Sequence, residues 1–522
     1  MRYLKKKKEN TGENLQQGIR FAPLSADLQD NTAKLRDLLT GCSDLVMREF
    51  AFGRQQETRC LLLYFDGLVD RPEIEENLLR PLLLELNMLE EDKKTEGQED
   101  LVKQVQERIL AMAELKTIET LEEVCHHISS GDTVLLIDGH NRGLVAGTRF
   151  WQSRPIQLPE NESVIQGPKE GFSETLRFNT ALLRRRIKST QFKIETMVLG
   201  KMTKTDVVIC YIEDIAPPNL IEEIKRRLSK IEIDGVLDPG YLEEFLEDTK
   251  WTIFGQAEYT EKPDRVCGHL LEGRVCVMAD GSPMALIVPV SFPQFLLAGE
   301  DYYQRYVPAT IYRIMRFCAF GVALLLPSLY VAVISYHQEM IPIALYLTIA
   351  ASREGVPFPA FVEAFIMELT FELLREAGLR LPRSIGPAIS IVGALVIGDA
   401  AVKAGLVSTP MVVIVAFTGI ASFAIPSYNA GTYFRIARFG VLLAASALGF
   451  FGIIAALLLL AVRLASLTSL GQPYLSPLAP FNRAQLSDVL VRRPWPMSTK
   501  RPYKEGMKNQ TRLEKAPGEN GG

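Results

Sequence analysis

The sequence predicts a polytopic α-helical membrane domain that follows a large soluble α/β (or α+β) N-terminal region of two subdomains. Three observations predict this fold class. Charged residues are concentrated before residue 317, and long apolar runs follow between 317 and 462. The whole-chain composition, 47% hydrophobic and 23% charged, hides this division because it resembles that of a soluble protein. In the first 310 residues, short apolar runs alternate with Leu-rich, charged helical patterns.

The N-terminal segment, 1–30, is expected to be basic and disordered, because its Lys run is followed by polar residues with few large apolar side chains. No apolar leader follows the Lys run, so we expect no signal peptide and a cytosolic N-terminal region. The seven cysteines are an odd number without a CxxC pair, which favours a reducing compartment and no disulfide framework. The net charge of −4 identifies no partner, and we expect no nucleic-acid binding.

The first soluble subdomain is predicted over 31–150. An apolar stripe at helical spacing predicts a helix at its start, and an apolar run that stops at Asp66-Gly67 predicts a buried strand ending in a turn. A proline in the first turn opens the next helix. The predicted elements are a helix over 31–48, a strand over 59–65, a helix over 72–86, and a hairpin of strands 133–137 and 143–148.

The second soluble subdomain is predicted over 151–310. Its boundary is placed in the Pro- and Gly-containing stretch 151–173, which is typical of a linker. The pattern of an apolar strand followed by a charged helix then recurs, which indicates a subdomain similar to the first. The predicted elements are a core strand over 206–212, a helix over 218–229 and a hairpin that turns at 280–282.

The membrane domain is predicted over 311–467, where apolar segments match the ~20 residues of helix that cross a bilayer. A shorter apolar piece, 341–352, is interpreted as an embedded or re-entrant element. Glycines spread through the spans allow close packing of the helices on one another or on neighbouring chains. The predicted spans lie near 317–336, 384–405, 409–426 and 439–462.

The orientation of the spans is inferred from arginines. Arginines precede the first span and recur in the basic C-terminal tail, 468–522, and both groups favour the cytosolic side. Four spans place both of these ends in the cytosol. Five spans would instead make the arginines at 375, 380, 383, 435 and 438 cytosolic and the tail external. We favour both ends inside. The tail is interpreted as a solvated, poorly ordered terminus, with contact to anionic lipid headgroups as the alternative.

Enzyme motifs are absent from the sequence, which has no GxxxxGK[ST], GxGxxG after a strand, GxSxG or HExxH. The five histidines include Cys125-His126-His127 and Cys267-x-His269, but neither spacing matches a common zinc site. The Asp-Gly pairs at 66, 138 and 280 are attributed to turn geometry. We therefore expect no catalysis, no cofactor and no metal.

A segment dense in acidic residues, 357–379, is predicted to form an amphipathic helix. Glu368, Glu372 and Glu376 recur every four residues on one stripe, which Arg375 joins, and Glu363 precedes them on the same helix. Two interpretations remain open. The helix lies on the membrane surface with its carboxylates solvated or paired locally, or the stripe faces a water-filled path, where copies of the chain around an axis would form cation-attracting carboxylate rings. These five residues are the candidate pore or gating residues.

A second charged pair, Asp399 and Lys403, lies within the predicted span 384–405. Their i, i+4 spacing favours a local ion pair near a helix end, with Lys403 extending toward the interface. We expect an intramembrane ion pair rather than a site of ion passage.

Five stretches of the chain are considered together. They are LLYFDGLVD (62–70), DGHNRGLVAGTRFWQSRPIQLPENESVIQGPKEGFSETLRFNTALLRRRIK (138–188), PFPAFVEAFIMELTFELLREAGLRLP (357–382), IGPAISIVGALVIGDAAVKAGLVS (385–408) and SYNAGTYFRIARF (427–439). Together, and in this order, they resemble the A subunit of GerA-type spore germinant receptors. The resemblance covers about two-thirds of the chain and excludes the extreme ends.

The resemblance implies a multi-pass protein of the spore inner membrane with a cytosolic N-terminal region. It implies B and C partner subunits, a nutrient germinant bound through the B subunit, and self-association into a ring-shaped, ligand-gated channel for monovalent cations. The alternatives are a solute carrier of the inner membrane, a non-conducting scaffold, or a paralogous spore membrane protein that shares the motifs.

Overall fold

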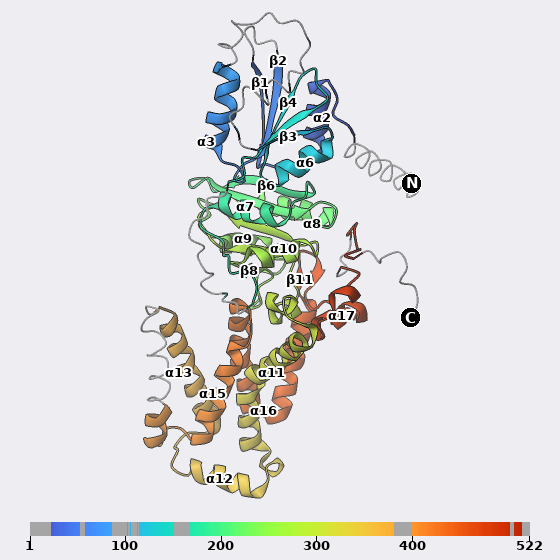
Figure 1. Cartoon of the computed structure of the whole chain (residues 1–522). Coiled ribbons are helices and arrows are strands. Elements are labelled where there is room, and N and C mark those ends of the chain that lie inside the picture. Colours follow the sequence, from blue (N-terminus) through green and yellow to red (C-terminus); the bar gives the residue numbers. More distant parts are fainter. Residues whose placement is uncertain are drawn as a thin grey trace, which may run out of the picture.

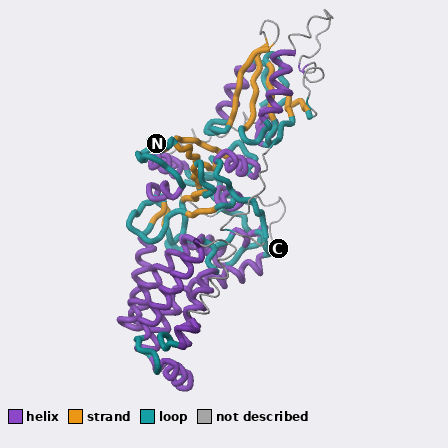
Figure 2. The backbone as a smooth tube through the Cα atoms, turned by 90° about the vertical axis from the view of Figure 1, so that its left-hand side faces the viewer, coloured by secondary structure: helices purple, strands orange, loops and turns teal. Residues whose placement is uncertain are grey.

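The chain folds into three parts that follow one another along an elongated molecule (Figures 1 and 2). The computed structural model describes residues 22–52, 58–85, 114–150, 166–380, 398–501 and 506–513, together with residues 102, 105, 112 and 162. Two sheet-containing parts come first, and a helix bundle occupies the opposite end. The predicted disordered segment 1–30 lies mostly outside the described residues, as does most of the predicted linker 151–173. The prediction of disorder was wrong for the described residues 22–30, because Leu24 and Leu28 are buried in the first core and a helix begins at Leu28.

The first part is an antiparallel sheet with helices on both faces. Its strands are β1 (Leu45–Phe52), β2 (Thr58–Phe65), β3 (Leu115–Ile118), β4 (Thr133–Ile137) and β5 (Gly143–Ala146), in the order β1-β2-β4-β5-β3. Successive side chains of a strand point to opposite faces. Leu61 and Leu63 of β2 therefore pack under α2 (Leu28–Leu38) and α6 (Leu121–Ser129). Cys60 and Leu62 pack on the other face, against α3 (Arg71–Ile74), η1 (Glu75–Leu79) and η2 (Pro81–Glu85).

The helix predicted over 31–48 was wrong in its second half. The observed helix α2 ends at Leu38, and Gly41 takes a φ of 81°, a left-handed conformation that stops a helix. Leu45 and Val46, which we had assigned to the helical stripe, begin β1 and pair with Phe65 and Tyr64 of β2. The strand 59–65, the helical segment 72–86 and the hairpin 133–148 are present, although η1 and η2 have π-helical hydrogen bonding.

The second part repeats the first. Its strands are β6 (Phe192–Leu199), β7 (Thr205–Ile212), β8 (Glu258–Thr260), β9 (Val275–Ala279) and β10 (Ala285–Val288), in the equivalent order β6-β7-β9-β10-β8. One face carries α7 (Leu176–Arg186) and α10 (Pro263–Leu270), and the other carries α8 (Pro218–Leu228) and α9 (Pro239–Leu246). The predicted strand, helix and hairpin of this part are confirmed, and so is the prediction of two similar subdomains.

The repeat extends to side-chain hydrogen bonds. In each part, the aspartate of an Asp-Gly hairpin turn accepts a hydrogen bond from the first backbone N–H of the helix that precedes the sheet. An asparagine of that helix also exchanges two hydrogen bonds with the serine six residues before it. The pairs are Leu28–Asp138 (3.1 Å) and Asn31–Ser25 in the first part, and Leu176–Asp280 (2.9 Å) and Asn179–Ser173 in the second. Asp138 and Asp280 thus each lie in a hairpin turn and accept a hydrogen bond from the N-terminus of a helix.

A buried arginine joins the two sheet parts. Arg184 of α7 donates to both carboxylate oxygens of Asp44, at 2.8 and 2.7 Å, and its guanidinium lies 4.1 Å from the ring centroid of Phe65. Backbone hydrogen bonds link the same regions, from Ser43 N to Ile194 O and from Ile194 N to Gly41 O. The two parts are therefore joined by ionic, aromatic and backbone contacts.

The helix bundle contains α11 (Tyr306–Tyr336), α12 (Ile343–Arg353), α13 (Ala360–Arg380), α15 (Thr409–Phe423) and α16 (Tyr428–Ser466). Among the described residues, α11 and α16 are long and apolar enough to cross a membrane, whereas α12 and α15 are shorter apolar helices. The predicted span 317–336 lies within α11, and α12 corresponds to the predicted embedded segment. Most of the predicted span 384–405 lies outside the described residues.

The segment α16 is interrupted, which corrects the continuous span predicted over 439–462. Gly449 has φ 61° and ψ −137°, so two helices meet there. A Cβ on Gly452 would lie 1.9 Å from Ala444 O, an approach that a straight helix does not allow. Phe434 and Leu464 pack in one cluster with Phe254 of the second part. The two arms, 428–448 and 450–466, therefore form a hairpin whose open end faces the sheets.

The described part of the C-terminal tail is folded, contrary to our interpretation of a solvated terminus. It contains β11 (Thr468–Ser469), β12 (Gln472–Pro473), α17 (Arg483–Leu490) and η7 (Trp495–Met497). Ser469 Oγ donates to Gln256 O and accepts from Val290 N, and Tyr474 is buried and donates to Gly255 O. The tail therefore returns from the bundle to the second sheet part.

A carboxyl group near the junction of sheet and bundle makes the stability of the fold depend on pH. Burial of Glu243 in α9 raises its pKa to about 7, and the neighbouring Glu247 and Glu244 act in the same direction. Its carboxylate accepts a hydrogen bond from Tyr259 Oη at 2.7 Å and lies near the loop that contacts Tyr433 of α16. The folded chain therefore holds the proton more tightly than the unfolded chain, whose carboxyl titrates near 4.5.

We predict that the free energy of unfolding decreases as the pH rises from about 4.5 to about 7 and then levels off, by an amount on the order of 1 kcal/mol for this partly exposed group. Glu243→Gln should flatten that segment of the curve and leave stability at low pH nearly unchanged. Chemical denaturation of the full chain in detergent across this pH range measures the effect. Parallel curves for wild type and variant would refute the assignment.

Candidate ion-pair site in the helix bundle

The acidic stripe lies in α13, and α16 places two arginines opposite it. The first arm of α16 carries Arg435 and Arg438, spaced i, i+3 and therefore on one face. Helix α13 packs against α11, α15 and α16. The elements thus bring the carboxylates of α13 and the guanidinium groups of α16 into the interior of the bundle.

Glu368 and Arg438 form the centre of the site. Their side chains are 1% exposed, and Arg438 Nη2 lies 2.6 Å from Glu368 Oε2. Arg438 also approaches Glu372 at 3.1 Å and Ala323 O of α11 at 3.4 Å. Within the described part of the chain, neither Glu368 oxygen accepts a hydrogen bond of good geometry. The pair is therefore held mainly by charge in a dry environment, where removal of one partner is costly.

Glu372 is shared by three arginines. Besides Arg438, it lies 3.2 Å from Arg435 and 3.4 Å from Arg375. Arg375 is held between the rings of Phe371 and Phe423 and donates to Ser422 Oγ of α15 at 2.8 Å. The site therefore consists of two carboxylates and three guanidinium groups from α13 and α16, and it carries a formal excess of one positive charge.

Glu363 has a separate role at the other end of α13. It is buried, and it accepts hydrogen bonds from Ser408 N at 2.6 Å and from Ser408 Oγ. Ser408 is the residue that precedes α15, so Glu363 satisfies a free N–H at the start of that helix. Arg353 of α12 lies 3.5 Å away. Glu363 therefore connects three helices and does not belong to the central cluster.

The remaining candidates are exposed. Glu376 pairs with Arg380 at 2.5 Å, and Asp399 pairs with Lys403 at 2.5 Å. In both pairs, more than half of each side chain is exposed on the single chain. The local pairs expected from spacing are thus formed, and the depth of Asp399 and Lys403 in a membrane stays a prediction.

The structure shows an arrangement of the stripe that neither interpretation included. In the single chain, the arginines of α16 cover Glu368 and Glu372, and both interpretations stay predictions for an assembly in a membrane. The sequence did contain the signal for this arrangement. Arg435 and Arg438 lie in an apolar stretch, and their i, i+3 spacing places them on one helix face, as the i, i+4 spacing does for Glu368 and Glu372. We had used them only to judge orientation.

The fold and this site define a class of protein: a duplicated α/β region joined to an apolar helix bundle with buried ion pairs. Among the described residues, no three His, Cys, Asp or Glu side chains gather in a way that could hold a metal ion. The chain belongs to the Bacillus/Clostridium GerA spore germination protein family, whose model matches residues 33–504. The predicted resemblance and the predicted fold class are confirmed.

Several curated proteins are similar over nearly the whole chain. Identity is 45% to the uncharacterized membrane protein YfkQ of Bacillus subtilis, covering 92% of this chain and 91% of that protein. It is 41% to the spore germination protein KA of Bacillus subtilis, covering 94% and 89%, and 38% to GerLA of Bacillus cereus, covering 92% and 96%.

One solved structure is also similar, the N-terminal domain of the A subunit of the Bacillus megaterium spore germinant receptor GerK3. It is 31% identical, and the match covers 52% of this chain and 98% of that one with a TM-score of 0.41.

Proposed function

We propose that this chain is a non-enzymatic A-type subunit of a nutrient germinant receptor in the spore inner membrane, and that it forms a ring of copies that conducts monovalent cations. Family membership supports the role in spore germination. The observation that carries the ion-conducting part is the buried cluster of Glu368, Glu372 and Arg438 between apolar helices. Ionisable residues at membrane depth are costly and usually mark ion pathways or their gates.

The geometry supports a gate more directly than an open filter. In the single chain, the guanidinium groups of α16 neutralise the carboxylates of α13, and a neutralised carboxylate does not attract cations. Opening would require the arginines to move away from Glu368 and Glu372 and expose their charge to a water-filled path. The reversal at Gly449 ends the arm that carries the arginines, so that arm is the element we expect to move.

The partners follow from the same proposal. A B subunit would bind the nutrient and, with a C subunit, pass the signal to this chain. Such a signal shifts a gate only if the partners bind its closed and open states with different affinity. The N-terminal region would be cytosolic. Both ends of the bundle lie against the second sheet part, through α11 and the tail, which fits an even number of crossings.

Current recordings of the purified chain in liposomes test the proposal. Wild type is compared with Glu372→Gln, which removes the shared carboxylate, and with Glu376→Gln, which removes an exposed one. We expect cation-selective unitary currents whose gating or selectivity changes in Glu372→Gln and stays near wild type in Glu376→Gln.

Other outcomes would support different functions. Solute-coupled flux without unitary current would indicate a carrier. Silence of the chain alone and with B and C subunits would indicate a non-conducting scaffold or a paralogous spore membrane protein that shares the motifs. Either result contradicts the channel.

A further inference from the structure

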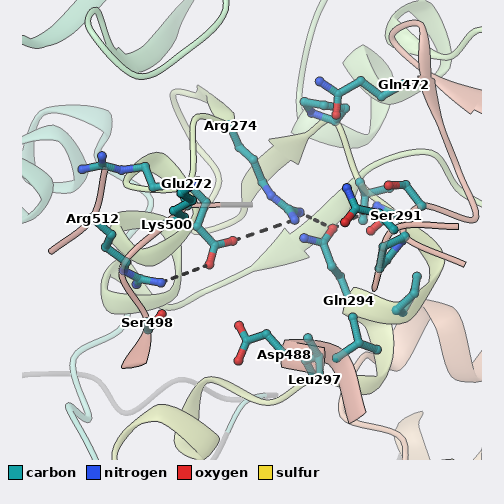
Figure 3. Close-up of a pocket in the computed structure, with 18 of the residues that line it drawn as sticks. Glu272, Arg274, Ser291, Gln294, Leu297, Gln472, Asp488, Ser498, Lys500 and Arg512 are labelled. Atoms are coloured by element: carbon teal, nitrogen blue, oxygen red, sulfur yellow. Dashed lines mark hydrogen bonds and ion pairs between the residues drawn. The ribbon is translucent and has the colours of Figure 1, made fainter. Parts of the chain in front are cut away.

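A cavity of about 390 Å³ lies between the second sheet part and the returning C-terminal tail (Figure 3). One wall comes from the start of β9 and the segment after β10, with Glu272, Arg274, Ser291 and Gln294. The opposite wall is formed by the tail. Its volume lies in the range of small-molecule sites, which run from roughly 300 to 1,000 Å³.

The lining is rich in positive charge. Five cationic side chains line the cavity against two carboxylates, those of Glu272 and Asp488. Within the described residues, Arg493 and Lys500 have no carboxylate within 4.0 Å, and both are exposed at the rim. The cations are Arg274, Arg493, Lys500, Arg501 and Arg512.

The buried end of the cavity contains an arginine with incomplete partners. Arg274 is 5% exposed, and its Nη1 donates to Gln294 Oε1, but its Nε has no hydrogen-bond partner in the described structure. Glu272 lies 4.0 Å from Arg274 and 3.9 Å from Arg512, too far for a direct hydrogen bond. Burial lowers the pKa of Arg274, as expected for a guanidinium whose charge is poorly compensated. Figure 3 shows these side chains arranged around the hollow.

The shortage of negative charge in the lining indicates an anionic ligand. Guanidinium groups bind phosphate through two parallel hydrogen bonds, and a lysine adds a point charge. Uncharged donors and acceptors complete the lining, among them Ser291, Ser498, Thr499 and Gln510. A phosphate-bearing group has both the charge and the acceptor oxygens to satisfy this set.

We propose that this cavity binds a phosphate group, carried by a soluble metabolite or by an anionic lipid headgroup, and that the tail closes over it. The cavity lies near the start of the first apolar helix, a position that fits a soluble metabolite as well as a lipid headgroup. Two lining residues contact each other and lie near α11. Tyr302 Oη donates to Asp488 at 3.2 Å, and Arg313 of α11 lies 3.8 Å from the same carboxylate. A ligand here would therefore stabilise the contact between tail and first apolar helix.

Binding is tested on the full chain in nanodiscs of phosphatidylcholine. Inorganic pyrophosphate is titrated by calorimetry as the soluble probe, and thermal unfolding in discs with added phosphatidylglycerol provides the lipid arm. We expect either heat of pyrophosphate binding or thermal stabilisation by phosphatidylglycerol, and we expect that effect to weaken as salt is added. Lys500→Gln combined with Arg493→Gln should weaken it by about tenfold or more, because charge-assisted hydrogen bonds are lost. Both residues are exposed, so folding should be preserved.

The matched control is Lys508→Gln, an exposed lysine of the same tail that does not line the cavity. Pyrophosphate binding identifies a soluble ligand, and stabilisation by phosphatidylglycerol alone identifies a lipid headgroup. The proposal is overturned if neither arm gives a signal with wild type, or if Lys508→Gln weakens the signal as much as the double variant does.

Discussion

Replacing Arg438 by leucine is expected to destabilise the helix bundle by about 3–5 kcal/mol. The change leaves the Glu368 carboxylate, which is 1% exposed, without its 2.6 Å partner and removes one of the three arginines around Glu372. A carboxylate that is buried without compensation costs far more than the ion pair itself contributes. Denaturation of the full chain in mixed detergent micelles measures the loss.

Two further variants make the result specific. Arg438→Leu combined with Glu368→Leu should recover most of the loss, because a buried ion pair replaced by apolar side chains is often tolerated. Arg380→Leu, which breaks the exposed pair with Glu376, should change stability by less than about 1 kcal/mol. If Arg438→Leu behaves like Arg380→Leu, the central pair does not hold the bundle together.

Local patterns in the sequence were sufficient to predict most of the strands of the soluble region. The strands β2, β4, β7 and β9 are short apolar runs bounded by Asp-Gly turns or charged residues, and each is fully or nearly buried between helices. Such runs have few alternative conformations, because a strand covered on both faces needs apolar residues at every position. In the helix predicted over 31–48, Leu45 and Val46 continued an apolar stripe at helical spacing, and only their pairing with β2 decides for a strand.

Local patterns in the sequence could not predict the contacts between distant segments. Arg435 and Arg438 meet Glu368 and Glu372 across more than 60 residues of sequence, and the reversal at Gly449 lies inside an uninterrupted apolar run. The backbone angles of Gly449 and the contacts between the two arms, and not the sequence pattern, distinguish two arms from one span. The tail was misjudged for a related reason, since its contacts with Gln256 and Val290 involve backbone groups that composition does not reveal.

These contacts also change how the arginines bear on orientation. We had counted Arg313, Arg435 and Arg438 by the positive-inside rule, which applies to loop cations near the membrane surface. All three form ion pairs with Asp301, Glu368 or Glu372; Arg313 and Arg438 are buried, and Arg435 is mostly covered. They therefore report internal packing and not the side of the membrane. Arg435 and Arg438 therefore no longer argue against four spans, and Arg313 no longer supports a cytosolic start of the first span. The topology itself stays a prediction.

Replacing Asp301 by asparagine is the second change for which we expect a large effect, again about 3–5 kcal/mol. Asp301 is buried at the junction of the soluble region and α11, where it accepts from Arg313 Nε at 2.9 Å and pairs with Arg316. Arg313 is 0% exposed, and its other carboxylate, Asp488, lies 3.8 Å away. Asparagine keeps the shape of the side chain but leaves that guanidinium poorly compensated, so the start of α11 should separate from the sheets.

Trypsin cleavage after the exposed Arg305 measures this separation directly. A loss of about 3 kcal/mol raises the open population by roughly two orders of magnitude, and cleavage should accelerate accordingly where opening and closing are fast. The matched control is Asp30→Asn, which breaks a partly exposed i, i+4 pair with Lys34 far from α11 and should leave the rate near that of wild type. Since Asp488, which lies near Arg313, lines the cavity proposed to bind phosphate, an unchanged rate in Asp301→Asn would mean that the tail holds α11 in place without this carboxylate.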